Sequence, residues 1–180
     1  MKVVRIFELL KGKLYSVEYD TDERHALQIL QDQWEDHTYF YEFFKKWLKE
    51  DYRNFYGTKK LSYIVEDAID DADTLLNVLI DVDADQIEIE KLFKPLDNRE
   101  NENESYELQK LKGKAYTLSF LRIYGLRYGN TIVITGGAIK LTKYMRDRDH
   151  TKLELEKLEV AKSYLADTEN EAEIVYLDIS

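Results

Sequence analysis

Helical and strand-like patterns occupy different parts of this chain, and that separation limits the folds it can adopt. Apolar residues recur at helical spacing in three stretches between residues 21 and 79. Beyond residue 112 the pattern changes, because five of the seven glycines lie there among short runs rich in β-branched and aromatic residues. Helices that are grouped ahead of a sheet, and do not alternate with its strands, favour an α+β fold.

The same periodicities predict where the individual elements lie. Strands are expected at residues 3–7 and 14–19 as a hairpin, then at 116–124, at 131–135 with a continuation at 139–142, and at 174–179. Helices are expected at residues 21–34, 38–49, 61–79 and 153–165. We therefore predict an N-terminal hairpin and helices packed with a C-terminal antiparallel sheet and a final helix.

The length of the chain and one polar stretch limit its possible domain organisation. At 180 residues and 21.4 kDa the chain is as long as one typical domain. Residues 97–105 are polar, low in complexity and close to the only proline, Pro95. We expect a single domain over residues 1–180, with this stretch as the candidate internal boundary between a hairpin and helical part (1–96) and a basic sheet with its helix (106–180).

The charge of the chain is distributed unevenly. The formal net charge is −10, yet residues 109–146 contain eight Lys or Arg residues and no Asp or Glu. The rest of the chain carries 18 basic against 36 acidic residues. An asymmetry of this kind suggests an anionic partner for one face. The alternative is that the basic segment pairs with the acidic helices of its own chain.

Several classes of site find no support in the sequence. The absence of cysteine excludes disulfides, thiolate metal sites and a thiol nucleophile. The acidic run that begins at Asp81 resembles a calcium loop but has Gln86 and Leu92 where that loop needs Gly and Glu. Phosphate-loop, dinucleotide and hydrolase motifs are absent, as are a secretory signal and an apolar run of about 20 residues. We expect a cytoplasmic protein with no cofactor, no metal and no membrane contact.

The segment from residue 121 to 128 interleaves two arginines with two tyrosines: Arg122, Tyr124, Arg127 and Tyr128. Arginine offers a planar fork for phosphate, and tyrosine offers a ring on which a base can stack. Arg122 and Tyr124 share a face with apolar residues, so neither face of this strand is cleanly polar. We therefore expect a sheet that is covered on both sides and a small site at the strand ends.

RNA cleavage at such a site is chemically feasible without histidine or carboxylate. Lysine and arginine can stabilise the pentavalent phosphate, and a tyrosine or lysine can move the proton of the 2′-hydroxyl. His150 follows the basic sheet directly and titrates near neutral pH, so a general acid or base role is conceivable for it. The alternative is an ordinary surface histidine.

The order of these features resembles the RelE/HigB superfamily of toxins, especially its phage-derived HigB-like branch. The resemblance spans about residues 94–165 and rests on Leu121-Arg122, a hairpin turn, the apolar strand at 130–134, the Lys-containing segment at 139–143 and a final helix. It implies a small α+β ribonuclease that cuts mRNA, usually on the ribosome, and is silenced by a cognate antitoxin. Arg122 and Lys140 match the family's arginine and first lysine, whereas Leu141 stands where its second lysine would be.

The residues and the resemblance together give the expected site. The expected catalytic residues are Arg122, Lys140 and Tyr124, and the expected RNA-binding residues are Arg127, Tyr128, Lys143, Arg146 and Lys114. The expected partners are RNA or the ribosome and an antitoxin protein. The alternative is a non-catalytic binding or regulatory protein whose basic sheet meets an acidic partner or a nucleic acid.

Overall fold

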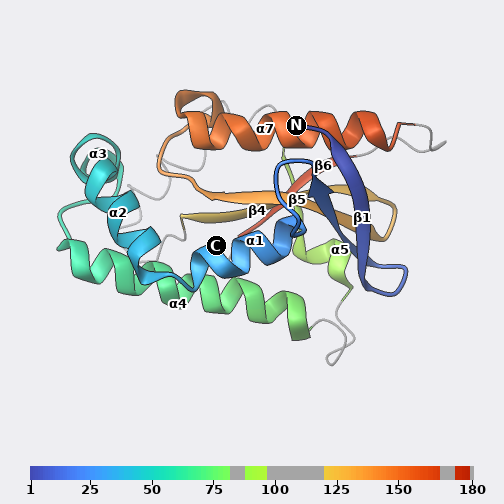
Figure 1. Cartoon of the computed structure of the whole chain (residues 1–180). Coiled ribbons are helices and arrows are strands. Elements are labelled where there is room, and N and C mark those ends of the chain that lie inside the picture. The colour runs from blue at the N-terminus through green and yellow to red at the C-terminus, as the bar shows by residue number, and fades with distance from the viewer. Residues whose placement is uncertain (82–87, 97–119, 167–172, 179–180) are drawn as a thin grey trace.

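The computed structural model describes residues 1–81, 88–96, 120–166 and 173–178 (Figure 1). The candidate boundary at 97–105, Lys114 and the expected start of a strand at 116 lie outside the described residues.

One mixed sheet runs through the described part of the chain. Its strands in chain order are β1 (Val3–Leu10), β2 (Leu14–Tyr19), β3 (Lys94–Pro95), β4 (Leu121–Tyr128), β5 (Thr131–Ile139) and β6 (Glu173–Leu177). Their spatial order is β1-β2-β5-β4-β6-β3. Every neighbouring pair is antiparallel except β2 and β5, which are parallel from Leu14↔Ile132 to Ser16↔Ile134. This pair joins the N-terminal hairpin to the C-terminal strands in a single sheet.

Helices cover the sheet on both sides. The longer ones are α1 (Ala26–Trp34), α2 (His37–Trp47), α4 (Leu61–Asp81) and α7 (Asp149–Tyr164). Shorter turns are the π-helical η1 (Leu48–Tyr52), α3 (Arg53–Phe55), α5 (Ile89–Leu92) and the 3-10 turn η3 (Met145–Asp147). Figure 1 shows α7 on one side of the sheet and α1 with α4 on the other. The predicted α+β class, the N-terminal hairpin and the final helix are confirmed.

The apolar stripes expected from helical spacing form the core. Leu30, Phe40, Phe44, Ile64 and Leu75 are all buried, together with the inward-facing residues of β4 and β5. The start of α1 differs from the expected one, because Asp22 bonds Arg24 and does not cap the helix. His25 caps it instead, with Nδ1 accepting the Gln28 amide hydrogen at 3.3 Å.

Two adjacent glycines let helices approach β5 from opposite sides. A Cβ atom at Gly136 would lie 2.0 Å from Oε2 of Glu154 on α7, and one at Gly137 would lie 2.8 Å from the Leu30 side chain on α1. The sequence predicts a break in the strand at Gly136-Gly137, and this prediction is wrong, because β5 continues to Ile139. The irregularity lies just before Gly136, where the pairing with β4 shifts register between Tyr124 and Gly125.

Glu154 is the most unusual group in this packing. The residue is 3% exposed, Oε1 accepts a 2.6 Å hydrogen bond from Lys157 Nζ, and the buried Oε2 has no hydrogen-bond partner among the described residues. Burial raises the pKa of Glu154 to about 7, although Lys157 and a backbone hydrogen bond with Gly137 both lower it. The desolvation of the carboxylate therefore outweighs its ion pair.

We expect Glu154→Gln to remove a pH dependence of stability. Because folding raises this pKa above the ordinary value of 4.5, protonation stabilises the folded state below about pH 4.5, and that contribution is lost as the pH rises through about 7. Relative to the variant, the wild type should lose about 3 kcal/mol of unfolding free energy between about pH 4 and pH 8. Urea unfolding of both proteins at several pH values across this range measures this loss.

The exposed Glu156→Gln on the same helix is the matched control and should follow the wild-type curve. If the unfolding free energies of the wild type and Glu154→Gln changed with pH in the same way, the raised pKa of Glu154 would be contradicted.

Candidate nucleic-acid interface

The register of the β4–β5 hairpin divides the expected site residues between two ends. Arg122 lies opposite Ala138, whereas Tyr128 lies opposite Thr131 next to the turn. A strand of eight residues is about 25 Å long, so these two ends are far apart. Arg122, Lys140, Lys143 and Arg146 lie toward one end, and Arg127 and Tyr128 lie at the other.

Arg122 takes part in an ion-pair network on the sheet. Its Nη2 lies 3.1 Å from Oδ2 of Asp178, whose side chain is 2% exposed, and Lys94 Nζ donates to Oδ1 of the same carboxylate at 2.7 Å. The guanidinium carbon lies 5.6 Å from the centre of the Tyr176 ring. The positive charge of Arg122 is therefore matched within the fold.

The other expected residues of the sheet are also engaged or covered. Tyr124 is 1% exposed and Lys140 is 8% exposed. At the far end, Arg127 pairs with Glu173 at 2.7 Å and donates to the carbonyl of Phe93. Tyr128 is half-buried, and burial raises its pKa. The described face of β4 is thus not an open platform of free cations.

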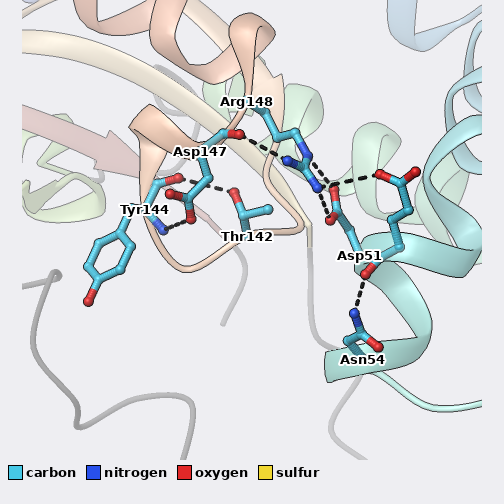
Figure 2. Close-up of polar contacts among 7 residues, drawn as sticks. Asp51, Asn54, Thr142, Tyr144, Asp147 and Arg148 are labelled. Carbon is cyan, nitrogen blue, oxygen red and sulfur yellow. Dashed lines mark hydrogen bonds and ion pairs between the residues drawn. The ribbon is translucent and has the colours of Figure 1, made fainter.

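The end of β5 leads into a second group of basic residues. Figure 2 shows one of them, Arg148, with its polar contacts. Arg148 forms a bidentate pair with Asp51: Nε lies 2.9 Å from Oδ2, and Nη2 lies 2.5 Å from Oδ1. Asp51 raises the pKa of Arg148, and the guanidinium lies 4.7 Å from the centre of the Trp47 ring. We call residues 140–150, with the facing side chains of Lys46, Trp47 and Asp51, the basic corner.

A π-helical turn places Asp51 in this corner. In η1 the chain makes hydrogen bonds that span five residues, as in the bond from the Arg53 amide to the Leu48 carbonyl. The wider turn changes which side chains face inward compared with a continued α-helix, and Asp51 and Tyr52 are buried. The predicted helix at 38–49 is confirmed in its α-helical part, which ends at Trp47.

Local hydrogen bonds hold the connection from β5 to α7 in one shape. Thr142 Oγ1 donates to the Tyr144 carbonyl at 3.1 Å, and the Tyr144 amide donates to the Asp147 carboxylate at 3.2 Å (Figure 2). Buried Thr151 donates to the Met145 carbonyl at 2.6 Å. The corner is therefore a structured part of the fold, able to present side chains in fixed positions.

Cations at the corner lie over aromatic rings. Lys143 Nζ is 5.1 Å from the centre of the Tyr144 ring, and Lys46 Nζ is 4.5 Å from that of Trp47. Tyr144 and Arg146 are exposed. Positive charge beside accessible rings suits both components of a single-stranded nucleic acid, its phosphates and its bases.

His150 lies on the inner side of the corner. Its Nε2 is 2.9 Å from the carbonyl oxygen of Ile139, and the Phe43 ring meets it edge-on at 5.0 Å between centroids. Burial is the main cause that lowers the pKa of His150, and Lys46 and Arg148 add to this effect, while the hydrogen bond and Asp51 oppose it. The imidazole is therefore mostly neutral near neutral pH.

Sequence reasoning did not identify Asp51, Trp47 or Lys46 as part of a site. The aromatic stripe of α2 was expected to be core, which is right for Phe40 and Phe44. No sequence pattern predicts a π turn, so the inward direction of the Asp51 side chain could not be predicted.

Other features of the described residues do not point to a competing site. A cleft of about 390 Å³ between the hairpin, α1 and α4 is lined by six leucines with His25 and Gln31, so it suits no polyanion. Within the described ranges, no group of three or more His, Cys, Asp or Glu side chains could hold a metal ion, and no helix has the length and apolar character of a membrane span. Comparisons with family models, curated proteins and solved structures found no match.

We expect Asp51→Ala to destabilise the protein by about 2 kcal/mol, because it leaves the partly buried Arg148 guanidinium without its bidentate partner. Glu50→Ala is the matched control, since Glu50 is exposed and lies 3.7 Å from Arg148, and it should cost at most about 0.5 kcal/mol. Chemical denaturation measures both.

A double-mutant cycle with Arg148→Met separates this pair from other effects of the substitution. A coupling energy near zero between positions 51 and 148 would show that the pair does not anchor the corner.

Proposed function

We propose that this chain is a RelE/HigB-like toxin of a toxin–antitoxin pair, which binds RNA at the basic corner and cuts mRNA. The observation that carries the proposal is the placement of Lys143, Tyr144 and Arg146 on a structured connection, with cations over aromatic rings. Lysine and arginine neutralise phosphates there, and exposed Tyr144 offers a ring for a base.

Leu141 stands where the family's second lysine would be, and this difference has a physical reason that is compatible with the proposal. Leu141 is buried in the core, so a lysine at this position would place its charge in an apolar environment. Lys143, two residues further along, is partly exposed and takes over the role of a second cation after β5. Lys140 and Arg122, the two residues matched by the resemblance, lie toward the same end of the hairpin.

The charge of the remaining chain supports binding in one orientation. The protein carries a net charge of −10, so its acidic surface repels a polyanion and leaves approach through the corner as the favourable route. An antitoxin partner, the ribosome as the place of action and a cytoplasmic location belong to the proposal through the resemblance alone.

A non-catalytic binding protein is the second candidate, favoured by a specific observation. Tyr124 and Lys140 are buried, and Arg122 is held by Asp178, so none of the three expected catalytic residues presents an open reactive group in this conformation. A protein that only binds RNA, or an acidic protein, through the corner would keep Lys143 and Arg146 functional without them.

We expect Lys143→Ala/Arg146→Ala to weaken binding of single-stranded RNA and to reduce the slope of log K against log salt by about 1.4, because two phosphate contacts are lost. Fluorescence anisotropy with a labelled oligoribonucleotide over a salt series measures both. Lys11→Ala/Lys13→Ala at the exposed hairpin turn changes the net charge equally and is the matched control. Equal losses for both pairs would mean that only total charge matters.

The same variants separate the two candidate functions in cells. On tightly induced expression in bacteria, the wild type and the hairpin control should arrest growth and produce new mRNA 5′ ends, and the corner variant should do neither. RNA binding by the wild type without new mRNA ends, on the ribosome or off it, would select the non-catalytic candidate.

A further inference from the structure

Within the proposed ribonuclease, on which this inference rests, we infer that His150 is the general base that takes the proton of the RNA 2′-hydroxyl. From the sequence alone there is no reason to prefer His150 over Tyr124 or Lys140 for this role. The structure offers one, because Tyr124 and Lys140 are buried while His150 is partly exposed, with Lys46 and Arg148 among the charged groups that act on it.

A hydrogen bond from the imidazole to the backbone fixes its tautomer. The carbonyl oxygen of Ile139 can only accept, so Nε2, 2.9 Å away, carries the hydrogen. In the neutral ring the lone pair then resides on Nδ1. A carbonyl at the end of β5 thus orients His150 as carboxylates and carbonyls orient histidine bases in other proton-transfer sites.

The ring is also held in place by its neighbours. The Phe43 ring meets it at 89° with centroids 5.0 Å apart, and the Trp47 ring lies 6.2 Å away. Because His150 belongs to the first turn of α7, three elements (β5, α2 and α7) determine its position. Such fixed placement is what a general base requires.

Charged groups from each neighbouring element act on His150. Lys46 of α2 and Arg148 before α7 disfavour a positive charge on the ring, and Asp51 of η1 favours it but is engaged with Arg148. Burial is the main cause that lowers the pKa of His150, so the imidazole is neutral and able to accept a proton near pH 7. Exposed Lys46, whose Nζ lies over the Trp47 ring, supplies a positive charge beside the imidazole, and such a charge stabilises negative charge that develops on a phosphate.

The reaction balances without a further reactant. Nδ1 of His150 takes the 2′-hydroxyl proton as the 2′-oxygen bonds to the adjacent phosphorus, and the bond from phosphorus to the 5′-oxygen breaks. The leaving 5′-oxygen takes a proton from solvent, and the imidazolium later returns its proton to solvent. The products are a 2′,3′-cyclic phosphate and a 5′-hydroxyl end.

The decisive variant is His150→Gln, whose amide NH₂ can still donate to the Ile139 carbonyl but which has no titratable nitrogen. We expect cleavage of an mRNA, tested free and in a translating ribosome mixture, to fall at least about 100-fold, while RNA affinity stays within about twofold. His37→Gln, an exposed histidine at the start of α2, is the control and should cleave as the wild type does.

The pH dependence of RNA cleavage by the wild type tests the role of His150 as general base without any variant. The single-turnover rate should rise with unit slope at acid pH and level off above a midpoint below 6.5, and NMR titration of the His150 ring should give the same midpoint. A profile whose midpoint does not follow the titration of His150 would overturn the inference even if His150→Gln fails to fold.

The outcomes distinguish this inference from the proposed function. If the wild type cleaves RNA and His150→Gln cleaves equally well, His150 is not the base and the ribonuclease proposal stands. If the wild type neither cleaves RNA nor arrests growth, the ribonuclease proposal fails and this inference fails with it.

Discussion

The close packing of helices onto both faces of β5 is the constraint on which the rest of the structure depends. Gly136 and Gly137 admit Glu154 of α7 on one face and Leu30 of α1 on the other. The same strand pairs with β2 in parallel and with β4 antiparallel, so it joins the two halves of the chain. A side chain at Gly137 would also lie 2.7 Å from the Arg122 carbonyl oxygen, which is backbone and cannot move aside cheaply. The end of β5 is therefore a rigid base for the basic corner.

The corner in turn depends on a contact between distant parts of the sequence. Asp51 and Arg148 are 97 residues apart, and their bidentate pair fixes the joint between α2 and α3 against the start of α7. Trp47 lies under Arg148 and near His150, so one aromatic residue contacts both the anchoring cation and the histidine. A π turn in place of continued α-helical hydrogen bonding directs Asp51 inward.

Periodicity predicted the helices well, because an apolar stripe on a helix is usually core. Phe40 and Phe44 recur at helical spacing in α2, as do Leu75 and Leu79 in α4, and all four are buried. It also predicted a sheet covered on both sides, from the mixed faces of β4. It could not predict the parallel pairing of β2 with β5, since strand pairing across more than 100 residues leaves no periodic signal. Nor could it predict that Arg122 pairs with Asp178, because sequence lists charges without their positions.

The count of charges and their arrangement lead to different conclusions about binding. Among the basic residues of 109–146, Arg122 and Arg127 face acidic partners on or next to β6, whereas Lys143 and Arg146 belong to the corner. The corner also gains Lys46 and Arg148 from outside that segment, but Asp51, Asp147 and Asp149 belong to it as well and offset part of its positive charge. The attractive field is therefore smaller and more local than eight charges suggest. At physiological salt, where screening acts over about 8 Å, such a field orients a polyanion at short range and attracts it weakly from afar. Specific contacts with the aromatic rings must then supply much of the affinity.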